Sequence, residues 1–268
     1  MIYIYSVIFG IVQGLTEFFP VSSSGHLLIT HTLFPVFTGV LALPFDAALH
    51  LATLAIIFIF YGKDFFRYAK AFFFFGTAED RRMAWMIIIA TIPAAVVGVL
   101  FEDVIAERTR NLSLVASMLI FGGVLFFAVE RWGSRSVSFE SLTMKQAIGI
   151  GCAQVFALIP GVSRSGSTII AGLALGLKRE TATHFSFLLA APIIAGAGLK
   201  SLFDLLRNSA VPSGGFIIFI TGFVTAMLVG ALCIRYLLTH VKTKTFLPFA
   251  VYRIVLGVLL LGIIFFQN

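Results

Sequence analysis

The sequence predicts an all-α polytopic membrane protein, with six transmembrane helices and two re-entrant helical hairpins in an inverted-topology repeat. Hydrophobic residues make up 59% of the 268 residues and charged residues only 12%, about half the charged fraction of a soluble domain. The mean hydropathy is +1.04. With so little charge to solvate a surface, much of the outside must face membrane lipids. We treat residues 1–268 as a single integral membrane domain.

The N-terminal apolar stretch, residues 2–34, is interrupted by Pro20, three serines and Gly25. It predicts two short helices joined by a polar turn, neither long enough to cross a bilayer. Broken helices occur at membrane depth only where they line a polar cavity or are buried in protein. We therefore interpret this stretch, and the similarly interrupted residues 146–177, as re-entrant hairpins.

Six further windows reach the roughly 20 apolar residues that a spanning helix needs. We interpret His31, beyond the first hairpin motif, as a histidine near the surface without a part in a site. His50, inside the first of these windows, is interpreted as a buried histidine satisfied by hydrogen bonds, with a role in a site as the alternative. The six windows predicted to span the membrane are, in chain order, 44–62, 84–101, 112–129, 183–203, 215–234 and 246–266.

Basic residues are distributed unevenly between these windows. Thirteen lie in the connections that follow the first, third and fifth windows, and four lie on the other side. By the positive-inside rule the thirteen face the cytoplasm. Both termini and the opening of the first hairpin then lie on the outer side of the membrane. The second hairpin enters the membrane from the cytoplasmic side. No clustered basic face is present, so we expect no nucleic-acid partner.

The two hairpins resemble each other at an offset of 141 residues. Residues 21–25 match residues 162–166 in four of five positions, and Gln13 matches Gln154. Each half of the chain, about 1–130 and 144–268, then contains one hairpin and three crossings. Because three is odd, the second half is inverted relative to the first. Such repeats place a binding site near the midplane, where the hairpins meet.

Three charged residues lie well inside apolar segments: Glu17, Arg164 and Arg253. A charge at that depth costs roughly 2.5–3.5 kcal/mol on insertion scales, so it is a functional hypothesis by default. The alternative for each is a structural ion pair that holds helices together.

The first hairpin contains four polar groups at helical spacing. Gln13 and Glu17 share one helix face, where their oxygens can hold Mg²⁺ or Ca²⁺ if phosphate oxygens complete the shell. Ser23 and His26 pair a hydroxyl nucleophile with a base if a helix begins near Ser22. The alternatives are that Ser22 and Ser23 only cap this helix, and that His26 only makes a hydrogen-bonded helix contact.

The second hairpin predicts an anion cradle. Its glycine-rich turn leads into a helix, whose N-terminal N–H groups attract anions, and Arg164 adds a fork suited to phosphate. Capping serines and packing glycines are the alternative. The residues that we assign to phosphate binding are Ser163, Arg164, Ser165, Gly166 and Thr168.

At these motifs the sequence resembles the undecaprenyl-diphosphate phosphatases, also called bacitracin-resistance proteins. The length and the order of segments agree from end to end. The matching stretches are residues 13–26, 50–54, 160–168, 185–192 and 246–253.

The resemblance implies hydrolysis of the terminal phosphate of a C55 prenyl diphosphate lipid. The product is the carrier lipid of bacterial peptidoglycan synthesis, in the plasma (inner) membrane. It further implies a homodimer, a site that opens to the periplasmic side, and a metal-linked motif at Gln13 and Glu17. Catalytic roles fall on Glu17, Ser23, His26 and Arg164.

Three positions depart from the family pattern. Gln13 stands where many members have Glu, Ala52 where many have Gly, and His184 where some have Glu. The first removes a negative charge beside the expected cation, so we expect it to shift metal affinity or pH optimum and not the reaction.

Two questions stay open from the sequence. The nucleophile is Ser23, His26 or water. The alternative function is a transporter that flips the carrier lipid, since inverted repeats with broken helices are typical of transporters. The grouping of Ser, His, Glu and Arg exceeds what binding alone needs, which favours the enzyme.

Overall fold

The computed structural model describes residues 2–37, 42–73, 75–207 and 215–267. Within these ranges the regular structure is helical, apart from one isolated bridge between Val137 and Leu177. The all-α class is confirmed. The elements are α1 (Ile2–Phe18), α2 (Ser23–Leu33), α3 (Ala42–Phe72), α4 (Ala78–Leu100), α5 (Glu102–Thr109), α6 (Leu112–Trp132), α7 (Met144–Val155), η2 (Phe156–Leu158), α8 (Arg164–Ala174), α9 (Arg179–Arg207), α10 (Gly215–Thr243) and α11 (Leu247–Gln267).

The six predicted spans are confirmed, because α3, α4, α6, α9, α10 and α11 are each long and apolar enough to cross a membrane. Several run past their apolar windows; α3, for example, covers 31 residues. Pro93 and Pro192 lie inside α4 and α9 without ending them. Sequence alone does not reveal α5, whose eight residues are too few and too polar to stand out.

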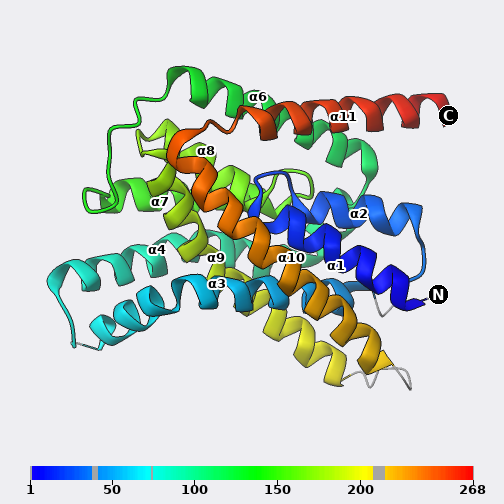
Figure 1. The fold of residues 1–268 in the computed structure, drawn as a ribbon, viewed down its shortest axis with the longest axis horizontal. Helices are drawn as coiled ribbons and strands as arrows, with labels where there is room; N and C mark the ends of the chain where they lie inside the picture. Colours follow the sequence, from blue (N-terminus) through cyan, green and yellow to red (C-terminus); the bar gives the residue numbers. More distant parts are fainter. Residues whose placement is uncertain (1, 38–41, 74, 208–214, 268) are drawn as a thin grey trace.

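Each predicted hairpin consists of two short helices joined by a turn, α1 with α2 and α7 with α8 (Figure 1). The second turn is longer and contains η2, but the N-caps of α2 and α8 have similar local structure. Ser22 and Ser163, the N-caps of α2 and α8, both have φ 77°. Their hydroxyls accept hydrogen bonds from the N–H groups of Gly25 at 3.3 Å and Gly166 at 3.0 Å. The matching motifs therefore fold alike, while the depth of the hairpins in a membrane stays a prediction.

Helices from the two halves of the chain pack against each other in matching pairs. α1 packs along α10 and its counterpart α7 packs along α4, while α3 pairs with α9 and α6 with α11. The α1–α10 contact is close because α1 has glycines there. A Cβ at Gly10 would lie 2.6 Å from the Gly222 carbonyl oxygen, and one at Gly14 would lie 2.8 Å from that of Ala226.

The two termini lie at one end of the molecule, and two of the predicted basic connections lie at the other (Figure 1). Figure 1 shows both termini at the right, and the α3–α4 and α6–α7 connections at the left. This agrees with the predicted grouping of the basic connections on one side.

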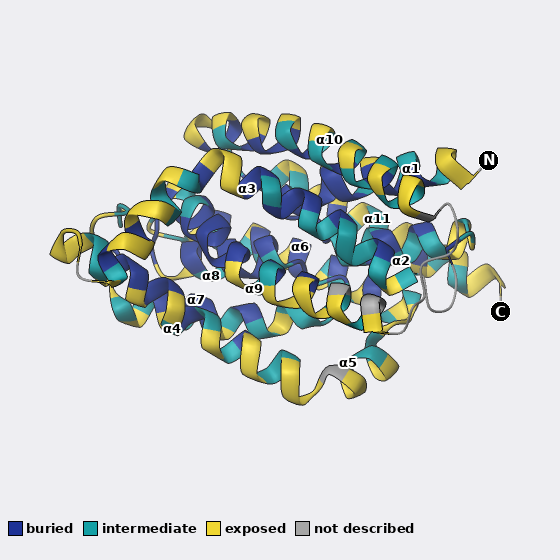
Figure 2. Ribbon diagram, turned by 90° about the horizontal axis from the view of Figure 1, so that it is seen from below, coloured by how far each residue is buried: buried dark blue, intermediate teal, exposed yellow. Residues whose placement is uncertain are grey.

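The burial pattern places one helix at the centre. Of the apolar window of α9, 61% is buried, against 22% for α11. Figure 2 shows buried faces gathered around α8 and α9 and exposed faces on the outside of α4 and α10. Many exposed side chains are large and apolar, such as Leu232 and Phe265. The outer surface therefore suits lipid.

Candidate active site

The tips of the two hairpins touch each other inside the molecule. The Ser22 hydroxyl, which caps α2, also accepts a hydrogen bond from the Gly161 N–H of the second hairpin at 3.1 Å. The Ser165 hydroxyl lies 3.4 Å from the carbonyl oxygens of Glu17 and Phe19. The predicted meeting of the hairpins is confirmed.

Arg253 of α11 donates hydrogen bonds to both hairpin tips. Its side chain is fully buried, and Gly122 and Gly166 leave room for it, because a Cβ at either position would collide with the guanidinium. Arg253 thus holds helices together, as its structural alternative expected, but through backbone carbonyl oxygens and not through the carboxylate of an ion pair. Its acceptors, at 3.0–3.3 Å, are the carbonyl oxygens of Pro20, Met118, Leu119, Gly161 and Val162.

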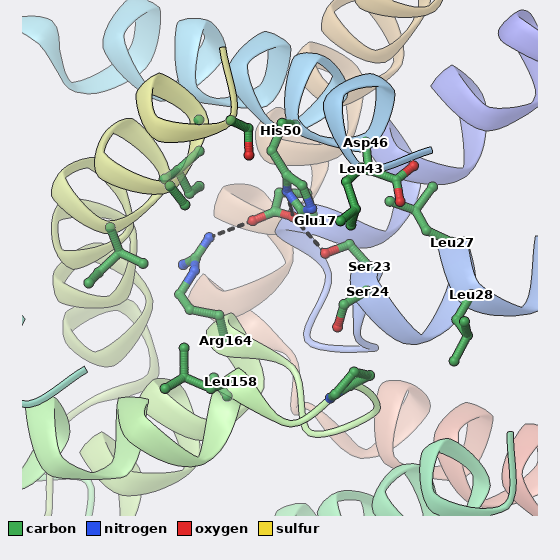
Figure 3. A pocket seen from close by; sticks show the side chains of 18 of the residues that line it. Glu17, Ser23, Ser24, Leu27, Leu28, Leu43, Asp46, His50, Leu158 and Arg164 are labelled. Atoms are coloured by element: carbon green, nitrogen blue, oxygen red, sulfur yellow. Dashed lines mark hydrogen bonds and ion pairs between the residues drawn. The ribbon is translucent and has the colours of Figure 1, made fainter. Parts of the chain in front are cut away.

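The Glu17 carboxylate lies where the hairpins meet, and it is 5% exposed. Its Oε1 accepts a hydrogen bond from Arg164 Nη2 at 2.9 Å. Its Oε2 accepts one from the Ser23 hydroxyl at 2.6 Å and one from Gln13 Nε2 at 3.0 Å. Figure 3 shows Ser23 and Arg164 pointing toward Glu17 from opposite sides. The structure thus brings together Gln13, Glu17, Ser23 and Arg164.

His50 joins this group: it is satisfied by hydrogen-bond partners, as interpreted from the sequence, and those partners are two of the predicted site residues. Its Nδ1 lies 3.1 Å from Glu17 Oε2 and 2.8 Å from Gln13 Nε2. His50 is on α3, 33 residues beyond Glu17, so no spacing rule connects the two. The available signal was an imidazole inside an apolar span with Asp46 one turn before it.

His31 also lies nearer to the site than its sequence interpretation suggests. Its Nε2 contacts both carboxylate oxygens of Asp46, at 3.0 and 3.1 Å. Both side chains line the same cavity as Glu17. The pair therefore extends the polar wall of the cavity from α2 to α3.

The cavity has a volume of about 650 Å³, within the range of small-molecule sites. One part of its wall carries the charged and polar groups Glu17, Ser23, His50 and Arg164. The rest is largely apolar, with Leu27, Leu28, Leu43 and Leu158 labelled in Figure 3. A polar wall beside an apolar wall suits a ligand with a charged head and an apolar chain.

Of the predicted phosphate cradle, Arg164 borders the cavity. Ser163 caps α8 through Gly166 N–H, Ser165 contacts the first hairpin, and the Thr168 hydroxyl lies 2.7 Å from that of Ser186. In this structure these groups hold the turn together and do not line the cavity. Their part in phosphate binding stays a prediction.

The predicted pair of Ser23 and His26 does not form, because His26 contacts other groups. Its Nδ1 lies 2.8 Å from the Ser22 carbonyl oxygen and its Nε2 lies 2.7 Å from the Tyr252 hydroxyl. α2 begins at Ser23, as predicted, but positions three apart on a helix differ by about 60° in direction. Ser23 consequently faces α1 while His26 stacks against Tyr252 of α11.

Few side-chain oxygens of Gln13 and Glu17 are free to ligate the predicted cation. Both Glu17 oxygens accept hydrogen bonds, one from a guanidinium, and Gln13 turns its amide nitrogen toward them. Gln13 Oε1 is buried without a partner in the described ranges. Among the same residues, no group of three or more His, Cys, Asp or Glu is placed to hold a metal. The cation at Gln13 and Glu17 stays a prediction, in which phosphate oxygens complete its shell.

Comparison with known proteins shows similarity over nearly the whole chain. The family profile "Bacitracin resistance protein BacA" matches residues 6–259. An undecaprenyl-diphosphatase of Corynebacterium glutamicum is 43% identical over 264 residues, covering 97% of this chain and 89% of the relative. One from Rubrobacter xylanophilus is 42% identical over 265 residues, covering 97% of both chains. One from Alteromonas mediterranea is 40% identical over 264 residues, again covering 97% of both.

Proposed function

The chain belongs to the bacitracin resistance protein BacA family, and on this premise we propose that the cavity at Glu17 is the active site of its reaction. The protein is an undecaprenyl-diphosphatase, a multi-pass membrane hydrolase. It converts undecaprenyl diphosphate to undecaprenyl phosphate and inorganic phosphate. As a member of this family, it confers resistance to bacitracin. One observation supports the location best: a buried carboxylate touches a serine hydroxyl and an arginine in a cavity with leucine walls.

The cavity matches the two parts of the substrate. The leucine walls contact the first units of the prenyl chain, while the rest of the chain stays in lipid. Arg164 binds the diphosphate: its side chain borders the cavity and is 12% exposed, and its buried Nε has no hydrogen-bond partner in the described part of the chain. A free Nε beside Nη2 can form the bidentate contact that guanidinium makes with phosphate. Arg164 then stabilises the charge of the transferring phosphoryl group.

Ser23 is the nucleophile in this proposal. Its hydroxyl donates to Glu17 at 2.6 Å, so the carboxylate is placed to take the proton as Oγ attacks the terminal phosphorus. The new Oγ–P bond forms as the bond from phosphorus to the bridging oxygen breaks, and undecaprenyl phosphate leaves. Glu17 passes the Ser23 proton to the departing bridging oxygen and is a carboxylate again. Water then attacks the phosphoserine phosphorus as the Oγ–P bond breaks. Glu17 takes a proton from that water and returns it to Ser23 Oγ, and inorganic phosphate leaves. Gln13 and His50 orient the carboxylate throughout.

The activity is tested by phosphate release from undecaprenyl diphosphate, using detergent-solubilised protein. Detergent abolishes vectorial transport but spares hydrolysis, so release distinguishes the enzyme from a flippase. We expect release in buffer that contains Mg²⁺ or Ca²⁺. A protein that binds the lipid but releases no phosphate with either ion would overturn the proposal.

A divalent cation, in this proposal, enters together with the diphosphate. The substrate supplies the phosphate oxygens that the side chains lack, and Gln13 Oε1 offers a further oxygen. Mg²⁺ or Ca²⁺ would neutralise phosphate charge when bound. Affinity for the ion should therefore depend on the charge at position 13.

We expect Gln13→Glu to lower the Mg²⁺ concentration needed for half-maximal hydrolysis by about tenfold, because affinity rises with the number of charged ligands. The new carboxylate would lie about 3 Å from that of Glu17, where two like charges favour a cation between them. The measurement is a MgCl₂ titration of EDTA-treated protein. Gln146→Glu is the control, since it adds the same charge at a capping position that tolerates Glu. An unchanged midpoint for Gln13→Glu contradicts the cation proposal.

We also propose that both termini and the cavity face the periplasmic side of the plasma membrane. The support is the uneven distribution of basic residues. In a cysteine-free background, we expect an impermeant maleimide to label Asn111→Cys in intact cells and Thr77→Cys only after permeabilisation. Both positions are exposed helix N-caps, so they form a matched pair. The reverse pattern contradicts the orientation; the homodimer stays a prediction, to be tested by mass measurement in lipid nanodiscs.

A further inference from the structure

Gln154 of α7 is buried beside the cavity, and its amide makes no hydrogen bond within the described part of the chain. Its side chain is 1% exposed, and it borders the same cavity as Glu17 and Arg164. Neither Oε1 nor Nε2 has a hydrogen-bond partner in the parts of the chain that the structure describes. A buried polar group without a partner destabilises a protein. An amide in this state next to a cavity points to a ligand that bonds to it.

The first hairpin has a partner for its glutamine amide that the second hairpin lacks. Gln154 is the counterpart of Gln13, whose Nε2 bonds to Glu17 four residues later. Four residues after Gln154, the second hairpin has Leu158 in place of a carboxylate. Both hairpins thus have the glutamine amide, and only the first has a carboxylate four residues after it.

We propose that the Gln154 amide binds the diphosphate group of the substrate, donating from Nε2 to a phosphate oxygen. This inference rests on the proposed active site and adds a contact from the α7 side of the cavity. The terminal torsion of a glutamine side chain is soft, so a rotation of the amide presents its N–H₂ group to the cavity. Phosphate oxygens accept such bonds strongly because they are charged.

The test compares Gln154→Leu and Gln154→Glu with the wild-type protein. For Gln154→Leu we expect kcat/KM for undecaprenyl diphosphate to fall about 10- to 100-fold, as for loss of a hydrogen bond to a charged group. The concentration of inorganic pyrophosphate that inhibits half of the activity should rise in parallel. Gln154→Glu should lose more, because a carboxylate repels the diphosphate. Cys152→Leu, at an exposed position of the same helix, is the control.

Thermal unfolding separates this role from a structural one. Leucine removes an unsatisfied amide of similar size, so Tm of Gln154→Leu should stay the same or rise while activity falls. Unchanged kcat/KM and pyrophosphate inhibition in Gln154→Leu would overturn the inference and leave the proposed function intact. A lowered Tm with unchanged pyrophosphate inhibition would likewise overturn it, in favour of a packing role. An inactive wild-type protein would instead reject the proposed function itself.

Discussion

We expect Arg164→Lys to lower kcat by about 10²- to 10³-fold, the typical cost of removing a preorganised charge-stabilising donor. Lysine keeps the positive charge but lacks the planar fork. The structure shows why the fork matters: Nη1 donates to the Ser186 carbonyl oxygen at 3.2 Å while Nη2 donates to Glu17 at 2.9 Å. An ammonium group carries its donors on a single nitrogen, so it cannot reproduce the separate Nη1 and Nη2 contacts together with a bidentate contact to phosphate.

The measurement is kcat and KM for phosphate release, with Tm recorded for each variant. Arg131→Lys, an exposed arginine at the end of α6, makes the same substitution away from the cavity and should match the wild-type protein. If Arg164→Lys keeps kcat within about threefold of wild type, Arg164 acts only as a diffuse charge and the bidentate contact is wrong.

The second large effect is expected for Ser23→Ala, which should reduce phosphate release at least about 10³-fold, since removal of a nucleophile abolishes the covalent route. The Ser23 hydroxyl is the group that donates to Glu17 at 2.6 Å, so the variant also leaves the carboxylate without a proton to take. Substrate binding, measured by inhibition with inorganic pyrophosphate in competition assays on residual activity, should change little.

Ser24→Ala provides the matched control, because Ser24 is the next residue and borders the same cavity. Among the described residues, the hydrogen-bond contact of its hydroxyl is with the Ser22 hydroxyl at 3.4 Å. The Ser24→Ala variant should retain most of its activity. Near-normal hydrolysis by Ser23→Ala would eliminate the serine nucleophile. Water activated by Glu17 would then be the nucleophile, in the same cavity and with the same role for Arg164.

The helices were predictable because each depends on a local property of the chain. A run of about 20 apolar residues has few alternatives to a spanning helix, since every backbone group must be satisfied internally in lipid. The same reasoning identifies the two interrupted stretches. It does not reveal α5, whose sequence is polar and short, nor the extension of α3 to 31 residues.

The site was predictable only in part. Glu17 and Arg164 stand out because a charge in an apolar segment requires a reason, and they do form an ion pair at 2.9 Å. His50 does not stand out in this way, because a neutral imidazole is tolerated in an apolar helix. Arg253 is equally conspicuous in the sequence, yet it binds backbone carbonyls of both hairpin tips.

The sequence by itself determined the membrane class, the six spans, the paired hairpins and the two charges at their tips, because composition, run length and repeats are written along the chain. The tertiary structure decided which side chains face one another. It turned Ser23 toward Glu17 and His26 toward Tyr252, and it placed His50 in the site and the amide of Gln154 beside the cavity. These contacts depend on how helices far apart in sequence pack together, and no local pattern encodes that packing.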